Sequence, residues 1–205
     1  DERIRLISEP DKGMYDGLNK GLSLYSGDAF GVLNSDDAYA APDTLSRIAK
    51  ALGSADMVHA SLVFRNWRGE IVRTWTAEER PRGGFRSGWM PAHPTFYVRR
   101  KVAETVGPFD LSYATASDYD WMLRAVDVHR FSLATLDNVL VNMAIGGRST
   151  KSLLSYAGHN LEALSARRRW LGSGFVDYAL IAKPGRKLRQ LAGLSLRADT
   201  GGKAS

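Results

Sequence analysis

The sequence has 205 residues, 44% of them hydrophobic, and no cysteine. This length and apolar content suit one globular domain with an appendage and exclude a disordered chain. Without cysteine, carboxylates and histidines are the candidates for chemistry. The net charge of +6 would suit nucleic acid, but residues 167–205 hold nine basic residues against two acidic ones. The rest of the chain is nearly neutral, so no nucleic-acid partner is expected.

The first third of the chain alternates between strand and helix patterns. Residues 3–7 and 29–33 are short apolar runs typical of strands, and 57–64 is a third. Amphipathic spacing predicts helices over 14–25 and 42–52, between these runs. This order predicts an α/β fold with a mainly parallel sheet flanked by helices.

The rest of the chain is less regular. Residues 65–94 are rich in Gly, Arg and Trp and resemble a substrate-side insertion with one strand. The later elements are expected as a strand at 93–98, helices at 99–106 and 117–126, and a strand at 131–143. A glycine-rich joint at 146–150 separates a catalytic domain, 1–150, from a helical, basic C-terminal extension, 151–205.

An acidic turn follows the apolar run 29–33. Asp36 and Asp37 lie where ligands bind in parallel sheets, outside the carboxyl end of a strand. Adjacent carboxylates supply the oxygen ligands that Mg²⁺ or Mn²⁺ requires. The residues alone leave a second interpretation open, in which the turn simply ends the strand and caps the next helix.

A second acidic pair begins the predicted helix 117–126, with Ser117 expected as its N-cap. The helix dipole would keep Asp118 ionised, which suits a general base that accepts a hydroxyl proton. Asp120 is a candidate for the acceptor or phosphate side of the site. Its alternative is an ion pair with Arg124, four residues further along the helix.

His93 lies between two prolines and is a candidate contact for phosphate or acceptor, with a purely structural role as the alternative. The four histidines lack a paired zinc-ligand spacing. The sequence also contains no Gly-x-Ser-x-Gly elbow, Walker-type loop or dinucleotide glycine fingerprint, which argues against hydrolases, NTPases and dehydrogenases.

Three groups of segments resemble the family 2 glycosyltransferases of the GT-A fold, especially bacterial enzymes that build surface polysaccharides. In chain order they are Ser8–Gly21 with Gly27-Asp28 and Val32–Asp37, His93-Pro94-Thr95-Phe96 with Gly107-Pro108-Phe109-Asp110, and Ala116–Asp120 with Leu123-Arg124 and Gly146–Ser149. Their order and spacing agree with the family over residues 8 to about 150. The resemblance implies a mixed, mainly parallel GT-A-like sheet.

The resemblance also implies roles for particular residues. Asp118 matches the family's catalytic base, and the acidic turn matches its metal and nucleotide-diphosphate site. Asn34 stands where the usual Asp-x-Asp motif has its first carboxylate, so Asp36, helped by Asp37, is the implied metal ligand. Lys12, Asn19, Asn34 and Asp36 are the expected donor-binding residues, although Lys12 and Asn19 also suit an exposed loop and helix.

The implied activity is transfer of a sugar from a UDP- or GDP-type donor to a hydroxyl of a saccharide or lipid-linked saccharide, with inversion and with Mg²⁺ or Mn²⁺. Relatives begin with a nucleotide-binding strand-helix-strand unit, and none of it precedes Asp1. The sequence therefore predicts weak donor binding by this chain alone. A catalytically inactive GT-A remnant or binding module is the alternative.

The basic tail suggests a location for the chain. Residues 167–194 interleave Lys and Arg with apolar side chains, as in a helix that lies on anionic lipid. The alternative is a helix packed on the catalytic domain with a solvated basic face. No apolar run is long enough to cross a bilayer. The expected location is cytoplasmic, peripheral on the inner face of the plasma membrane.

Overall fold

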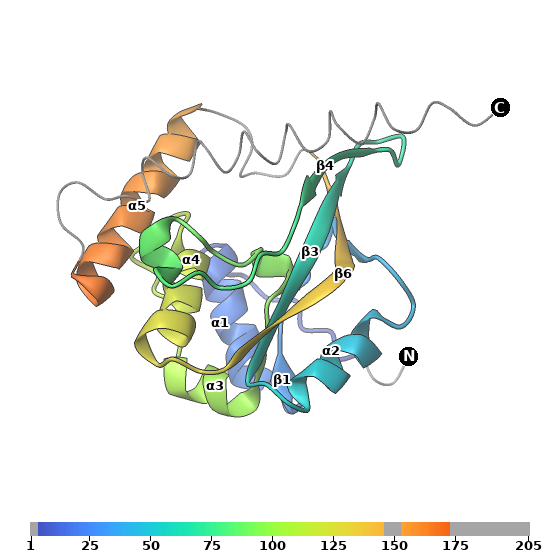
Figure 1. Cartoon of the computed structure of the whole chain (residues 1–205), viewed down its shortest axis with the longest axis horizontal. Coiled ribbons are helices and arrows are strands. Elements are labelled where there is room, and N and C mark those ends of the chain that lie inside the picture. The colour runs from blue at the N-terminus through green and yellow to red at the C-terminus, as the bar shows by residue number, and fades with distance from the viewer. Residues whose placement is uncertain (1–3, 146–152, 173–205) are drawn as a thin grey trace.

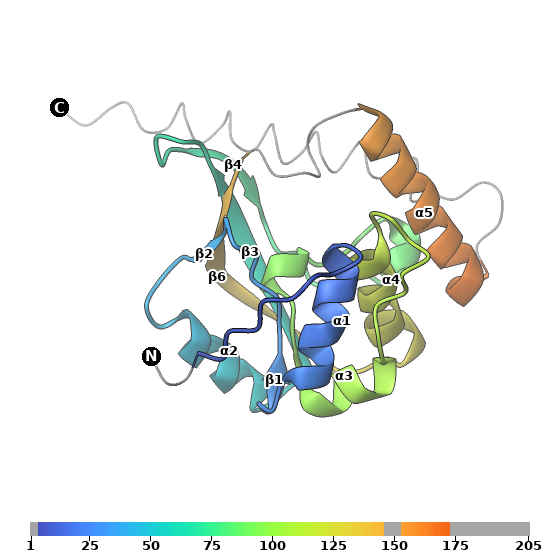
Figure 2. The ribbon, with the colours of Figure 1, turned by 180° about the vertical axis from the view of Figure 1, so that it is seen from behind.

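The computed structural model describes residues 4–145 and 153–172. Its helices are α1 (Met14–Leu24), α2 (Thr44–Leu52), α3 (Arg100–Val106), α4 (Ser117–Leu123) and α5 (Leu153–Leu171). Its strands are β1 (Ala29–Phe30), β2 (Ala38–Tyr39), β3 (Met57–Arg65), β4 (Ile71–Trp75), β5 (Tyr97–Arg99) and β6 (Leu133–Ala144). Helices α1, α3, α4 and α5 lie on one side of this sheet and α2 lies on the other (Figures 1 and 2).

The strand order is β1-β5-β3-β6-β2, and β4 pairs with β3 as a hairpin. The predicted mixed sheet flanked by helices is confirmed. Among the strand pairs of the described chain, however, only β3 with β6 is parallel. The expected predominance of parallel pairing is thereby corrected. Successive short strands such as β1 and β2 join the sheet at its two ends and run antiparallel to their neighbours.

The strand predicted at 3–7 is not present in its described part. Residues 4–7 belong to no helix or strand, and Ile4 and Leu6 are 72% and 86% exposed. The pattern of apolar residues was suitable for a strand, but a strand also needs a hydrogen-bonding neighbour. None of the described strands pairs with this segment.

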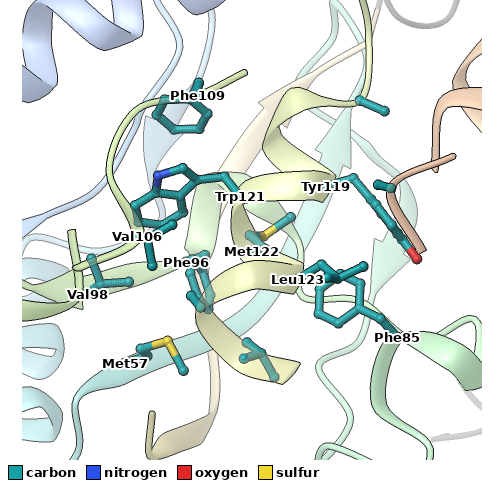
Figure 3. Packing of buried hydrophobic residues seen from close by; sticks show 14 of the residues in the cluster. Met57, Phe85, Phe96, Val98, Val106, Phe109, Tyr119, Trp121, Met122 and Leu123 are labelled. Carbon is teal, nitrogen blue, oxygen red and sulfur yellow. The ribbon is translucent and has the colours of Figure 1, made fainter. Parts of the chain in front are cut away.

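The long strand β3 separates two apolar cores because its side chains alternate between the sheet faces. Met57 packs with the α1, α3 and α4 side, where Trp121 stacks on Phe109 at a ring-centroid distance of 5.3 Å (Figure 3). Val58 packs with Ile48 and other apolar residues of the α2 side. Burial on both faces explains why β3 reads as a continuous apolar run.

The segment 65–94, expected as a substrate-side insertion, contributes buried side chains to the core. Phe85 and Trp89 are almost fully buried, and the Phe85 ring contacts Tyr119 edge to face at 5.0 Å. Gly84 has a φ of +48°, and a Cβ there would lie 2.4 Å from a carboxylate oxygen of Asp127. Glycine is therefore required at this position by a close approach, and not only for chain mobility.

Helix α5 packs against α4. Ala163 and Ala166 are fully buried in the larger core, and Arg167 is buried as well. The predicted joint at 146–150 and the amphipathic stretch 178–194 lie outside the described residues. Within the described part of the chain, no helix is long and apolar enough to span a membrane.

Candidate active site

The proposed base lies at the start of α4. Asp118 is in the first turn of this helix, and 19% of its side chain is exposed. The hydroxyl of Tyr15, from the first turn of α1, donates a hydrogen bond of 3.0 Å to Asp118 Oδ1. Burial raises the pKa of Tyr15, and the neighbouring Asp118 charge raises it further. Tyr15 is therefore a neutral donor that fixes one carboxylate oxygen.

His93 faces the other oxygen of this carboxylate. Its Nδ1 lies 3.9 Å from Asp118 Oδ2. Burial lowers the pKa of His93, and the attraction of Asp118 opposes that shift only in part. The imidazole is thus neutral near pH 7. Next to it, Thr95 Oγ1 donates to the carbonyl of Ala60 at 2.8 Å, which attaches the short 3₁₀ helix η2 (His93–Thr95) to β3.

The loop that leads into α4 is held by a side chain of α5. Ser117 is the first helical residue and not the predicted N-cap, which is Ala116. The Glu162 carboxylate of α5 accepts hydrogen bonds from the backbone N–H groups of Ala114, Thr115 and Ala116 at 2.8 to 3.0 Å. Although burial opposes ionisation, these bonds hold the pKa of Glu162 below its usual value. Helix α5 therefore positions the segment that leads into the base.

Asp120 points into the fold and is only 1% exposed. One of its carboxylate oxygens accepts from Arg124 Nε at 2.9 Å, and the other accepts from Trp170 Nε1 at 2.7 Å. The ion pair that the sequence left as an alternative is present. Because both oxygens accept hydrogen bonds inside the fold, we do not include Asp120 in the proposed acceptor or phosphate side of the site.

The acidic turn connects β1 to β2. The backbone N–H of Asp37 donates to the carbonyl of Asn34 at 3.1 Å, and Asn34 Nδ2 donates to Asp37 Oδ2 at 2.9 Å. Asp37 Oδ1 is buried and, among the described residues, finds no hydrogen-bond partner of ordinary geometry. Burial raises the pKa of Asp37, and the neighbouring charge of Asp36 raises it further. The hydrogen bond from Asn34 and the nearby backbone amide of Ala144 oppose this rise.

This turn fits a divalent cation in part. The lone buried oxygen of Asp37 and the exposed carboxylate of Asp36 are hard oxygen ligands, and a cation would relieve the cost of burying the Asp37 charge. Among residues 4–145 and 153–172, no group of three or more metal-ligating side chains occurs. Two carboxylates leave most coordination positions for phosphate oxygens and water, as Mg²⁺ prefers.

Two expected donor-binding residues have different surroundings. Asn19 Nδ2 donates to the carbonyl of Phe109 at 2.9 Å, and Phe109 N–H donates to Asn19 Oδ1 at 2.7 Å. Both ends of this amide therefore join α1 to the loop before α4. Lys12 is exposed, and its backbone N–H donates to Asp16 Oδ2 at 2.9 Å. The Lys12 ammonium remains the better donor-side candidate.

The residues of the candidate site thus form two groups. Tyr15, His93 and Asp118 come together from α1, η2 and α4, whereas Asn34 and Asp37 bond to each other on the β1–β2 connection. The sequence analysis missed Tyr15 and Glu162. The spacing of Tyr15 and Asn19, four residues apart on one helical face, was the available signal that both contact the same neighbouring loop region.

The mixed sheet flanked by helices is the fold of the GT-A-type glycosyltransferases. In keeping with that class, the model of glycosyl transferase family 2 matches residues 1–112. The chain belongs to glycosyl transferase family 2.

Curated relatives are similar to this chain in sequence, and solved structures are similar to it in fold. The chain is 29% identical over 126 residues to a PGL/p-HBAD biosynthesis glycosyltransferase of Mycobacterium tuberculosis, covering 60% of this chain and 47% of the relative. It thus spans about half the length of such relatives. The fold resembles residues 1–349 of TarS from S. aureus, solved with UDP-GlcNAc, at a TM-score of 0.53 and 13% identity, covering 82% of this chain and 49% of that chain. The UDP complex of the same protein gives a TM-score of 0.50 at 15% identity, covering 78% and 46%.

Proposed function

We propose that this chain takes part in moving a sugar from a nucleoside-diphosphate donor to an acceptor hydroxyl, with inversion, in the synthesis of a cell-surface polysaccharide or glycolipid. The observation that carries the proposal is the half-buried Asp118 carboxylate, with Tyr15 bound to one oxygen and His93 beside the other. Membership of glycosyl transferase family 2 supports it. The UDP- and UDP-GlcNAc-bound neighbours support a nucleotide-sugar partner.

In the proposed reaction, Asp118 Oδ2 accepts the proton of the acceptor hydroxyl. The hydroxyl oxygen forms a bond to the anomeric carbon as the bond from that carbon to the diphosphate oxygen breaks, and the nucleoside diphosphate leaves with the bonding electrons. Because the Tyr15 hydroxyl takes one lone-pair site of Oδ1, Oδ2 is the oxygen with more free lone pairs for this proton. Neutral His93, whose Nδ1 lies 3.9 Å from Asp118 Oδ2 and thus outside hydrogen-bond distance, is proposed to contact the acceptor.

Asp36 and Asp37 would hold Mg²⁺ or Mn²⁺ beside the donor diphosphate. A bound cation supplies positive charge that stabilises the departing diphosphate. The buried Asp37 oxygen supports this role, and Asn34 contributes by orienting the second oxygen of the same carboxylate. The proposal predicts that Asp36→Asn weakens Mn²⁺ binding, measured by titration calorimetry, while the fold and its melting temperature stay unchanged.

The proposed base is tested by Asp118→Asn, which preserves shape and removes the proton acceptor. We expect release of nucleoside diphosphate from UDP- or GDP-sugars to fall by about 10²- to 10⁴-fold, with donor affinity retained. Asp43→Asn is the matched control, since Asp43 forms an exposed pair with Arg47 on α2. Full activity in the Asp118 variant would overturn the assignment. Donor binding without turnover in the parent protein would instead favour the inactive binding module.

The acceptor is proposed to be a saccharide or a lipid-linked saccharide. A membrane contact through residues 167–171 finds little support, because several of these side chains face the protein. Arg167 donates to the Tyr119 hydroxyl at 2.7 Å, and Arg169 pairs with Asp110 at 2.8 Å. This part of the tail corresponds to the packed helix that the sequence left as an alternative.

A further inference from the structure

The turn of the β3–β4 hairpin carries an unusually exposed tryptophan. Trp67 is 87% exposed, whereas Trp89 and Trp121 are 2% exposed. The hairpin turn lies at the opposite end of the sheet from α2 (Figures 1 and 2). On the adjoining strand β4, Ile71 and Val72 are 49% and 41% exposed. The hairpin therefore presents a large aromatic and two β-branched apolar side chains to solvent at one extremity of the sheet.

The turn is well braced by its own polar groups. Asn66 Oδ1 accepts from the backbone N–H groups of Arg68 and Glu70, each at 3.0 Å. Gly69 has a φ of +80° and donates its N–H to the Asn66 carbonyl at 2.9 Å. Arg65 Nη1 donates to the Gly69 carbonyl from the base of the hairpin. This bracing fixes the backbone around Trp67 without burying the indole ring.

Residues 65–73 of the hairpin carry three arginines and one glutamate, a net charge of +2, although the turn itself balances Arg68 against Glu70. The guanidinium of Arg68 lies 4.7 Å from the Trp67 ring centroid, and that of Arg73 lies 4.9 Å from the Phe64 ring. Glu70 is the one acidic residue between 65 and 76. Its carboxylate accepts from Asn66 Nδ2 at 2.8 Å, so it is tied back to the turn. Arginine next to exposed tryptophan is the composition of a membrane-interface anchor.

We propose that the hairpin tip, residues 66–72, docks into the interface of an anionic membrane. The indole ring would enter the headgroup region while Arg68 contacts lipid phosphates, with Ile71 and Val72 adding apolar contact. A soluble saccharide would not need the net positive charge of residues 65–73, and a partner strand would be opposed by charges on the hairpin. An anionic lipid surface can both accommodate the indole ring and neutralise the arginine charge.

The orientation that follows agrees with a lipid-linked acceptor. Arg65, at the base of the tip, is in register with Ala144 on β6, and the amide of Ala144 lies near Asp37 of the acidic turn. Docking of the tip would bring that turn close to the lipid surface. This consequence rests on the proposed function, whereas vesicle binding by the hairpin does not.

The proposal is tested by flotation of the 205-residue protein with vesicles of phosphatidylglycerol and phosphatidylcholine, compared with phosphatidylcholine alone. Trp67→Ala should weaken binding to the anionic vesicles roughly tenfold, and Arg68→Gln about fivefold. The matched controls are Leu45→Ala and Lys50→Gln on α2, both at exposed positions. They should bind like the parent protein. Vesicles with brominated chains should quench a fluorescence component that Trp67→Phe removes.

Each remaining outcome contradicts the proposal. Equal binding of the parent and the two tip variants would place any membrane contact elsewhere in the chain. Equal binding to both lipid compositions would remove the role of the arginine. Protection of Trp67 by a soluble saccharide, or by self-association without vesicles, would assign the tip to an acceptor or to a second copy. None of these measurements depends on sugar transfer, so failure of the proposed function is distinguishable.

Discussion

Two carboxylates two residues apart have opposite surroundings. Asp118 is half-buried beside Tyr15 and His93, whereas Asp120 is enclosed by Arg124 and Trp170. We expect Asp120→Ala to lower the free energy of unfolding by about 3 to 5 kcal/mol, because it leaves Arg124 buried without its partner. Urea denaturation measures this loss. Asp118→Asn, compared in the same assay, should differ little from the parent, and a similar loss in both variants would contradict the distinction.

The hydroxyl of Tyr15 gives a second residue-scale prediction. Tyr15→Phe keeps the ring that stacks near Phe109 at 6.2 Å but removes the hydrogen bond to Asp118. The carboxylate is then free to rotate, so kcat should fall by roughly tenfold while KM for the donor changes little. Steady-state kinetics separate these constants. An equal effect of Tyr25→Phe, at the other end of α1, would indicate a general packing effect instead.

At this scale the sequence predicted residue types better than their partners. Asp118 was predicted as the base because helix-start position, acidity and family resemblance all coincide in one short segment, and this role stays a prediction. Asn19 was expected to bind the donor, yet its amide is used on Phe109, 90 residues away in the sequence. A contact of that separation depends on how α1 packs against the loop before α4. Local spacing places Tyr15 and Asn19 on one face of α1, but it does not identify Phe109 as the partner.

Helix α5 is linked to the active-site region by one acidic side chain. Glu162→Ala removes the acceptor for three backbone amides at residues 114–116, so we expect a loss of about 1 to 3 kcal/mol in the free energy of unfolding. Sugar transfer should decline as well, because Asp118 follows directly. Glu104→Ala, at an exposed position on α3, is the control. Unchanged stability in the Glu162 variant would show that water replaces the carboxylate without cost.

Strand β3 carries a pH-sensitive group. His59 is 1% exposed, its Nε2 lies 2.9 Å from Thr135 Oγ1 on β6, and burial lowers its pKa from 6.5 to about 4. Between these values the unfolded chain binds a proton that the native protein does not, so native stability falls as the pH drops from 6.5 to 4. The total effect is about 1 to 3 kcal/mol.

Replacement of this histidine tests that effect. His59→Gln should flatten the pH dependence of the urea midpoint between pH 6.5 and 4, even if its stability at pH 7 is lower. His93 titrates in the same direction and remains in both proteins, so the difference between them isolates His59. Identical pH slopes for the parent and the variant would contradict the assignment.

The elements were predicted best where pattern and boundary agree. Helix α1 was expected at 14–25 and is found at Met14–Leu24, because its apolar spacing ends at a Ser-Gly turn. The strand expected at 93–98 is divided, since Pro94 favours the 3₁₀ turn η2 before β5 begins. The helix expected at 117–126 continues as a π-helix over Arg124–Val128, which spacing alone cannot distinguish from an α-helix.

At the scale of the whole molecule, the boundary between 1–150 and 151–205 is a proposal that α5 makes testable. Its Ala163 and Ala166 lie in the same core as Trp121. We therefore expect α5 to unfold together with the sheet, giving one calorimetric transition with equal calorimetric and van't Hoff enthalpies. Arg167→Met should shift this transition without splitting it. Two separate transitions would favour an independent C-terminal unit.

The sheet topology was the least predictable level. Alternation of strands and helices correctly indicated an α/β fold, but it also suggested mainly parallel neighbours. The order β1-β5-β3-β6-β2 inserts late strands between early ones, so the pairing depends on contacts between distant segments. An apolar run identifies a buried strand, but it does not indicate whether the neighbouring strand is parallel or antiparallel. The parallel pair of β3 and β6 is the part of the expectation that holds.

The Glu162 contact has a consequence for protein engineering. Recombining family members at a point between β6 and α5 would separate this carboxylate from the loop amides at 114–116 that it holds. We expect a chimera with a foreign C-terminal helix to form its sheet correctly. It would still misplace the loop 114–116 before α4, because that loop would lose the carboxylate that binds its amides. A chimera designed to exchange substrate specificity should therefore take residues 110–116 and α5 from the same parent protein.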